Sequence, residues 1–135
     1  MTVQFSTTVR NARLDAFETA VGTSAVLKIR TGAPPADVAT ADSGTVLATI
    51  SLPSDWMAAA SGGSKAKSGT WQDASADNTG TAGHFRLYAS DGTTAHMQGT
   101  VTITGGGGDM TVDNTSFAAG QQFTVTSFTL TDGNA

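Results

Sequence analysis

Hydrophobic residues near the start of the chain recur at the spacing of an amphipathic helix. Between residues 6 and 21 they fall on one broad face, at positions Val9, Leu14, Phe17 and Val21. A serine at position 6 suits the N-cap, and the glycine that follows Val21 suits the left-handed residue that ends many helices. We therefore predict one helix over about residues 6–21, preceded by an arm of residues 1–5.

From residue 25 onward the hydrophobic period changes to two, which is typical of short β-strands. The predicted strands are 25–31, 45–52, 65–72, 84–89, 97–104, 109–113 and 122–131. Long polar segments at 32–44 and 73–83 interrupt them. The pattern predicts a mainly β single domain over residues 1–135, an antiparallel β-sandwich or a jelly-roll-like fold with one N-terminal amphipathic helix.

The last strand changes parity, because Phe123 and Val125 share one face while Phe128 and Leu130 share the other. A β-bulge near Ser127 would reconcile the two halves.

Alternation also assigns polar side chains to faces. It places Lys65, Lys67 and His84 toward solvent, and it leaves Trp56 to plug one end of the core.

The amino-acid composition limits the classes of partner that we expect for this chain. The 135 residues include no cysteine, which excludes disulfides and cysteine-based zinc sites. The net charge is −4 and the seven basic residues are scattered, so we expect no nucleic-acid partner. No apolar run approaches the length of a membrane helix, and residues 1–6 do not resemble a signal peptide. We expect no membrane partner and synthesis in a cytoplasm.

Candidate chemistry is sparse. His84 and His96 could hold a metal only with a third ligand such as Asp91 or Asp73, and solvent-facing histidines explain the pattern better. Residues 73–80 superficially resemble a calcium loop but lack its glycine and glutamate, so a polar turn explains them as well as adventitious calcium binding does. The glycine run 105–108 lacks the lysine of a phosphate loop. We expect no catalytic residue, no metal site and no cofactor.

Two stretches carry a family likeness: residues 11–22 with 27–35, and residues 52–60 with 67–71. Together they resemble small uncharacterised proteins encoded among the structural genes of tailed bacteriophages and prophages. The resemblance implies a non-enzymatic virion component, made in the bacterial host cytoplasm and present in many copies. Among virion roles we expect a capsid decoration or cement protein, whose partners are the major capsid protein and copies of itself. The alternative is a tail-tube, neck or connector subunit, with tail or neck proteins as partners.

For a structural role we predict three contact regions. They are the arm with Val3 and Phe5, the loop with Pro34 and Pro35, and an edge of the C-terminal strand with Phe128 and Leu130.

A carbohydrate-binding module, as part of a fibre or receptor-binding protein, is the alternative from another class. Its sugar-stacking platform would consist of Trp56, Trp71 and Tyr88.

Overall fold

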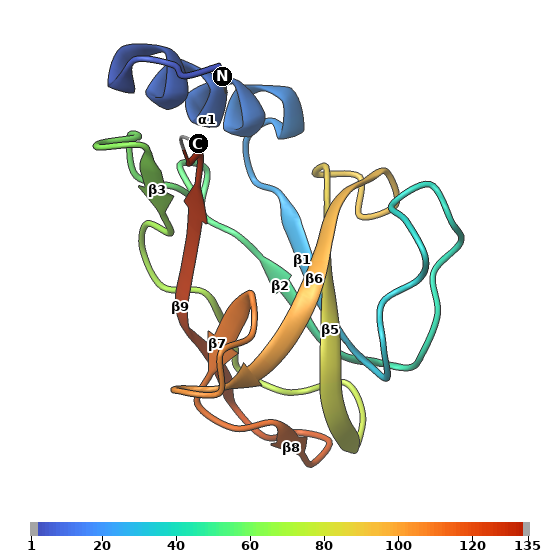
Figure 1. Ribbon diagram of the computed structural model, residues 1–135. Coiled ribbons are helices and arrows are strands. Elements are labelled where there is room, and N and C mark those ends of the chain that lie inside the picture. Colours follow the sequence, from blue (N-terminus) through green and yellow to red (C-terminus); the bar gives the residue numbers. More distant parts are fainter. Residues whose placement is uncertain (1–2, 134–135) are drawn as a thin grey trace.

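The computed structural model describes residues 3–133 and shows a mainly β fold with one helix near the N-terminus (Figure 1). The mainly β class with a single N-terminal helix is confirmed. The elements are α1 (Thr7–Val21), β1 (Val26–Thr31), β2 (Val46–Ser51), β3 (Ser64–Ala66), β4 (Gln72–Asp73), β5 (Gly80–Tyr88), β6 (Ala95–Ile103), β7 (Met110–Val112), β8 (Ser116–Phe117) and β9 (Phe123–Thr131).

The strands form one curled sheet in the order β2-β1-β5-β6-β7-β9-β3, with β4 added on β9 and β8 added on β5. All neighbours are antiparallel except β6 and β7, which run parallel. The sheet wraps around the core as a half-barrel (Figure 1). The architecture therefore differs from the antiparallel sandwich or jelly roll expected from the sequence, in that one mixed sheet encloses the core.

The parallel β6–β7 pair depends on the glycine run between the two strands. Parallel neighbours usually need a connection of a dozen or more residues, whereas here residues 104–109 suffice. Gly105 and Gly107 have φ of 86° and 81°, which lets the chain double back. A Cβ on Gly106 or Gly108 would lie 2.7 or 2.8 Å from the Thr102 side chain, so both positions need glycine. The glycine run 105–108, which the sequence indicates as a simple turn, forms a compact reversal that packs on β6.

A row of aromatic rings runs through the core and joins the helix to the sheet. Successive centroids lie 5.7 to 6.1 Å apart along the series Phe17, Trp56, Trp71, Phe128 and Phe85. Trp56 is fully buried, and its indole N–H donates to the Gly22 carbonyl at 2.9 Å. The expectation that Trp56 plugs one end of the core is confirmed.

The helix begins and ends where the sequence predicts. The Ser6 hydroxyl accepts a hydrogen bond from the Val9 amide, and Gly22, at φ 92°, closes the last turn by donating to the Glu18 carbonyl. Leu14 and Val21 are buried, but Val9 is 41% exposed and lies off the buried face. The helix covers one end of the half-barrel (Figure 1).

The predicted bulge in the last strand is confirmed. The register of β7 on β9 passes from Ser127 to Val125, which leaves Thr126 unpaired. As a result Phe123, Val125 and Phe128 are all buried on the same side.

Other strand bounds differ from those expected. The predicted strand 65–72 is interrupted, because only β3 and β4 at its two ends pair with β9. β5 begins at Gly80, within a segment predicted as a loop, and β8 was not predicted.

One glycine of β5, Gly83, packs closely against the segment that follows β1. A Cβ on Gly83 would lie 2.3 Å from the Gly32 carbonyl oxygen, where the chain leaves β1. We expect Gly83→Ala to lower the free energy of unfolding by about 1–3 kcal/mol, as overpacking does, in urea denaturation. Gly133→Ala is the control, since its Cβ would meet no atom within 4 Å. Equal stabilities for the two variants would contradict the close approach.

Candidate interaction groove

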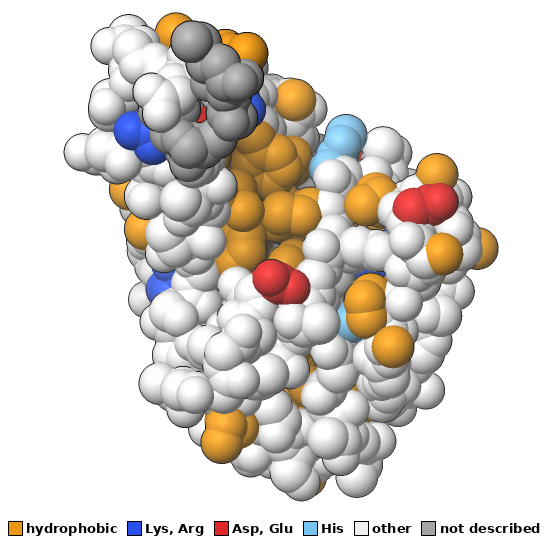
Figure 2. Space-filling model, in the orientation of Figure 1, with side chains coloured by type: hydrophobic (Ala, Val, Ile, Leu, Met, Phe, Trp, Pro, Cys, Tyr) orange, Lys and Arg blue, Asp and Glu red, His pale blue; other side chains and the backbone are white. Residues whose placement is uncertain are grey.

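A groove with both apolar and polar lining lies between β6 and β9, on the helix side of β7. Its volume is about 410 Å³. Its apolar lining comes from Phe85, Met97, Phe128 and Leu130, and polar residues including Gln98 and Thr129 lie along its margins. Figure 2 shows hydrophobic side chains gathered in a hollow below the helix. This is the candidate functional site, and we call it the β6–β9 groove.

The groove exists because β7 is shorter than its neighbours. β7 pairs with residues 101–103 of β6 on one side and with the 125–128 part of β9 on the other. Beyond it, no described strand lies between residues 95–100 of β6 and residues 129–131 of β9. Strands one apart in a sheet are separated by about 4.8 Å, so two strands that flank a third are about 10 Å apart. At β7 the two margins are therefore one strand apart, and beyond β7 they spread apart toward the helix (Figure 1).

Backbone groups on both margins point into this opening. The Thr100 amide donates to Asp109 at 2.8 Å on the β7 side, so alternation directs the backbone N–H and C=O of Gln98 the same way. On the opposite margin, the Phe128 carbonyl accepts from Lys67 on the β3 side. The backbone groups of the next residue, Thr129, therefore face the groove, and those of Thr131 do so too.

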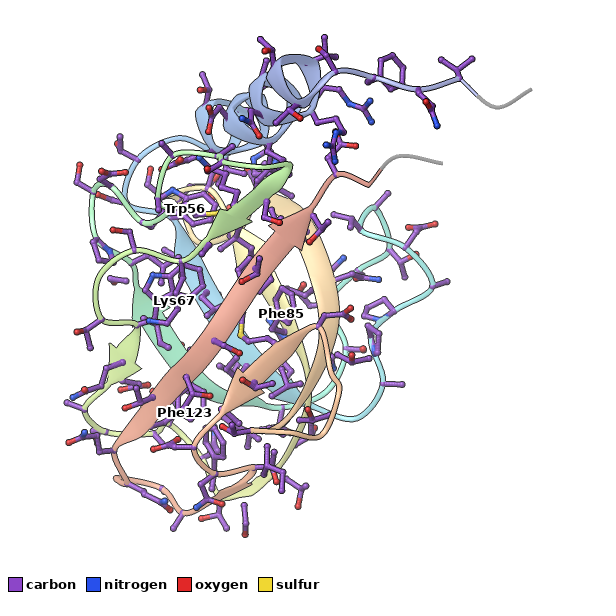
Figure 3. All side chains as sticks on the ribbon, turned by 60° about the vertical axis from the view of Figure 1, so that its left-hand side comes forward. Trp56, Lys67, Phe85 and Phe123 are labelled. Carbon is purple, nitrogen blue, oxygen red and sulfur yellow. The ribbon has the colours of Figure 1, made fainter. Side chains whose placement is uncertain are left out.

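The arm before the helix presents apolar side chains to solvent. Val3 is 72% exposed and Phe5 is 43% exposed. The Arg13 guanidinium lies 4.8 Å from the centre of the Phe5 ring. The segment leads away from the barrel (Figure 3). Met1 and Thr2, the rest of the predicted arm, lie outside the described residues. Contact of this arm with a neighbour stays a prediction.

On the outer face of the sheet, a cluster of charged side chains holds the loop of residues 32–44. The Asp42 carboxylate accepts from Arg30 at 2.7 Å, from Arg86 at 2.5 Å and from the Tyr88 hydroxyl at 2.8 Å. Arg86 also donates to the Val38 carbonyl at 2.7 Å. The guanidinium groups are almost fully buried, so the loop covers the outer face of β1 and β5. We call these residues the Asp42 cluster.

The surroundings of Asp42 keep its carboxylate charged. Burial acts to raise the pKa of Asp42, but hydrogen bonds from Tyr88 and Arg86 and the charge of Arg30 outweigh that effect and hold this pKa below its usual value. The ionised carboxylate offsets part of the charge of two buried guanidiniums.

The same loop corrects one expectation and leaves another untested. His84 is fully buried, and its Nδ1 donates to the Gly32 carbonyl at 2.8 Å, so the solvent-facing position expected for it is wrong. Pro34 and Pro35 are half-buried, and the Pro35 carbonyl accepts from the Gln98 side chain. Their role as partner contacts remains a prediction.

A second buried cation joins the helix to the sheet. The Lys65 ammonium contacts Asp15 at 2.6 Å and Glu18 at 2.8 Å, and it donates to the Ala58 carbonyl. Burial acts against the charged form, but the hydrogen bonds to Asp15 and Glu18 outweigh it and raise the pKa of Lys65. Lys65 is 2% exposed, so its predicted solvent-facing position is wrong, whereas Lys67 is half-exposed.

The glycan-stacking interpretation is wrong. Trp56, Trp71 and Tyr88 are all fully buried, so none of their rings offers a face to a sugar.

The predicted edge at the C-terminal strand is present only in part. β9 pairs with β7 on one side and with β3 and β4 on the other. Phe128 is buried in the core, and Leu130 is half-buried on the wall of the groove. Only residues 129–131 of β9 face an opening.

Two acidic residues, Asp73 at the end of β4 and Asp77 after it, secure the outer edge of β2. Asp73 accepts from the Thr49 amide at 3.0 Å, and Asp77 accepts from the Thr49 hydroxyl at 2.8 Å. Among residues 3–133, no three histidine or acidic side chains are grouped to hold a metal ion. No helix within that range is long and apolar enough to cross a membrane.

Comparison with family models, with curated proteins and with solved structures finds no match for this chain.

Loss of the Asp42 charge should loosen the loop. We expect Asp42→Asn to lower the free energy of unfolding by about 1–3 kcal/mol, because two buried guanidiniums lose their counter-charge while the exposure of Asp42 moderates the loss. The folded-state pKa is lowered from 3.8, so this contribution is present above that pH and is lost as pH falls through the folded value.

Urea denaturation at pH 7 and in the acid range measures this effect, together with the rate of proteolysis within residues 32–44. Asp55→Asn, at an exposed carboxylate, is the control. If both variants kept wild-type stability and proteolysis at pH 7, the Asp42 cluster would not hold the loop.

Lys65 and Lys67 form a matched pair for a second test. Lys65→Met should lower the free energy of unfolding by about 1–3 kcal/mol, because two carboxylates and a carbonyl lose the donor that they share. Lys67→Met, whose ammonium contacts only the Gly69 carbonyl and the edge of the core, should change stability by less than about 0.5 kcal/mol. Because the pKa of Lys65 is raised from 10.5, its contribution is present below that pH and is lost as pH rises through the folded value. Thermal denaturation of both variants measures the difference, and similar losses would contradict the burial of Lys65.

Proposed function

We propose that the protein is a non-enzymatic structural component of a tailed-phage particle, where many copies decorate the major capsid lattice. The observation that carries this proposal is the β6–β9 groove, whose apolar floor is bounded by strand margins with unpaired backbone groups. Strand margins of this kind bind extended segments of other proteins through backbone hydrogen bonds. The resemblance of residues 11–35 and 52–71 to proteins of phage structural genes supplies the class of particle.

The use of charge within the fold supports a contact role. Arg30, Arg86 and Lys65 are nearly buried, and each pairs with a carboxylate that secures a loop or the helix. The apolar surface that remains exposed includes Val3 and Phe5 of the arm. These features suit a protein that presents a fixed shape to neighbours.

A decoration protein stabilises a shell through repetition. Each contact between small subunits is modest, but simultaneous contacts on a lattice raise the effective concentration of every further contact. A half-barrel with an anchored helix and a secured long loop loses little conformational entropy when it binds. Many small interfaces, in place of one large interface, then stabilise the lattice.

The test is the copy number of this chain in purified particles of the phage or prophage that encodes it. Quantitative mass spectrometry should give a ratio to the major capsid protein near unity or at a fixed large fraction of it. The tail-tube subunit of the same particles serves as an internal reference. A few copies per particle would overturn decoration and assign the chain to the neck, tail or fibre. Absence from particles would overturn the virion proposal.

A further inference from the structure

We infer that α1 exchanges between two copies of this chain, so that the helix of each protomer occupies the α1 seat of the other. The α1 seat consists of Trp56, Ala60, Gly63, Lys65 and Asp132, the residues that hold the helix at the end of the half-barrel. The inference does not rest on the proposed function, because the purified chain tests it without particles.

The helix is attached to the barrel through contacts that each involve a side chain. Within residues 3–133, no backbone–backbone hydrogen bond joins α1 to a strand. The buried or partly buried apolar side chains of α1 are Leu14, Phe17 and Val21, and the last two pack on the core. Release of the helix would therefore leave every pair of strands in the sheet intact.

The α1 seat is complementary in charge to the helix. The Lys65 ammonium contacts Asp15 and Glu18, which lie three residues apart and so share one helix face. The Asp132 carboxylate accepts from Arg13 at 2.9 Å. A helix that fills this seat must therefore carry two carboxylates on one face and a cation beside them. α1 itself has this pattern, which identifies the occupant as the helix of another copy.

The connection between α1 and β1 is short and strained. Gly22 is held by Trp56 and Ala25 is buried, so the hinge consists of Thr23 and Ser24, which are both exposed. Ser24 has a φ of 53°, and it is the one residue other than glycine with positive φ in the described part of the chain. The left-handed conformation is unfavourable for a residue with a Cβ. Short hinges under strain favour the exchange of the element that they connect.

The hinge length sets the geometry of the exchanged dimer. An extended chain spans about 3.3–3.6 Å per residue, so the three steps from Gly22 to Ala25 span about 10 Å. Because α1 covers one end of the half-barrel, a hinge of this reach requires that the same ends of two barrels face each other (Figure 1). The two hinges would then cross between the protomers in an extended conformation, which relieves the strain at Ser24.

The same contacts form at the α1 seat in the monomer and in the exchanged dimer. The balance between the two states therefore depends on the hinge and on the entropy that is lost when two chains associate. The relief of strain at Ser24 counts twice, because an exchanged dimer has two hinges. We expect a monomer–dimer equilibrium that depends on concentration and responds to the conformation of residue 24.

Substitutions at Ser24 test the hinge in sedimentation velocity over a concentration series. Ser24→Gly removes the strain of the closed turn, since glycine adopts positive φ readily, and should raise the dissociation constant of the dimer about tenfold. Ser24→Pro excludes the closed turn, because proline fixes φ at about −65°, and should lower that constant by at least the same factor. Ser24→Ala keeps a Cβ at the same φ and is the control, so it should leave the constant unchanged.

Cysteine pairing tests which chain supplies the helix, because the chain has no cysteine of its own. A size-tagged Asp15→Cys variant and an untagged Ala60→Cys variant are unfolded in urea, refolded together at high concentration and oxidised. The Asp15 carboxylate accepts from the Ala60 amide at 3.0 Å, so we expect a heterodisulfide on a non-reducing gel. Lys65 keeps Glu18 as a partner in the Asp15→Cys variant. Ala16→Cys, at an exposed position of the helix, is the control and should give no heterodisulfide above background.

Two results would overturn the inference. One is a wild-type chain and a Ser24→Pro variant, both folded by circular dichroism, that remain monomeric throughout the concentration series. The other is a dimer that gives no heterodisulfide above the Ala16→Cys control, which would mean that another surface joins the copies. If Ser24→Pro does not fold, the wild-type chain and the heterodisulfide decide. Neither result changes the copy number in particles, which tests the proposed function separately.

Discussion

Burial of β5 on both faces is the constraint on which the rest of the structure depends. Phe85 and Leu87 face the core, while Arg86 and Tyr88 face the opposite side and are equally buried. A buried guanidinium needs a counter-charge and acceptors for its hydrogen bonds, because desolvation of an unpaired charge is costly. Asp42 supplies that charge from the loop of residues 32–44, so the loop is fixed as a second layer over the sheet. The close approach of Gly83 to the start of this loop belongs to the same requirement.

A buried cation paired with carboxylates also positions the helix, at the other end of the barrel. Lys65 turns a buried ammonium toward Asp15 and Glu18, which fixes the rotation of α1 about its axis. Arg13 pairs with Asp132 at 2.9 Å and ties the C-terminal segment to the same helix. Apolar packing through Phe17 and Trp56 then closes the end. The arm therefore leaves the domain from a helix whose position is set by charge pairs as well as by hydrophobic contact.

Local patterns predicted the local features well. The helix ends depend on Ser6 and Gly22, and the β9 bulge depends on the parity of Phe128, so each follows from a few adjacent residues. Alternation also separated the two faces of β5, but it does not reveal whether a face is covered. For that reason His84 and Lys65 were assigned to solvent although both are buried. Asp42 gave no sequence signal of its own, because its partners lie in strands far along the chain. A cation at a central position of a predicted strand, as at Arg86, is the one hint that a covering loop exists.

The groove could not be predicted because it follows from the length of one strand and the direction of another. An antiparallel neighbour joined by an ordinary hairpin would run the full length of β6. The double-back at Gly105 and Gly107 instead returns the chain only as far as Val101 before β7 begins, and Gly108 packs on Thr102 at that point. β7 is thereby limited to Met110–Val112, and above it β6 and β9 spread apart toward the helix (Figure 1). The aromatic row from Phe17 to Phe85 holds the surrounding walls together without a strand in that space. The groove is therefore a consequence of where the chain reverses after β6, and no local pattern of hydrophobic and polar residues encodes that position.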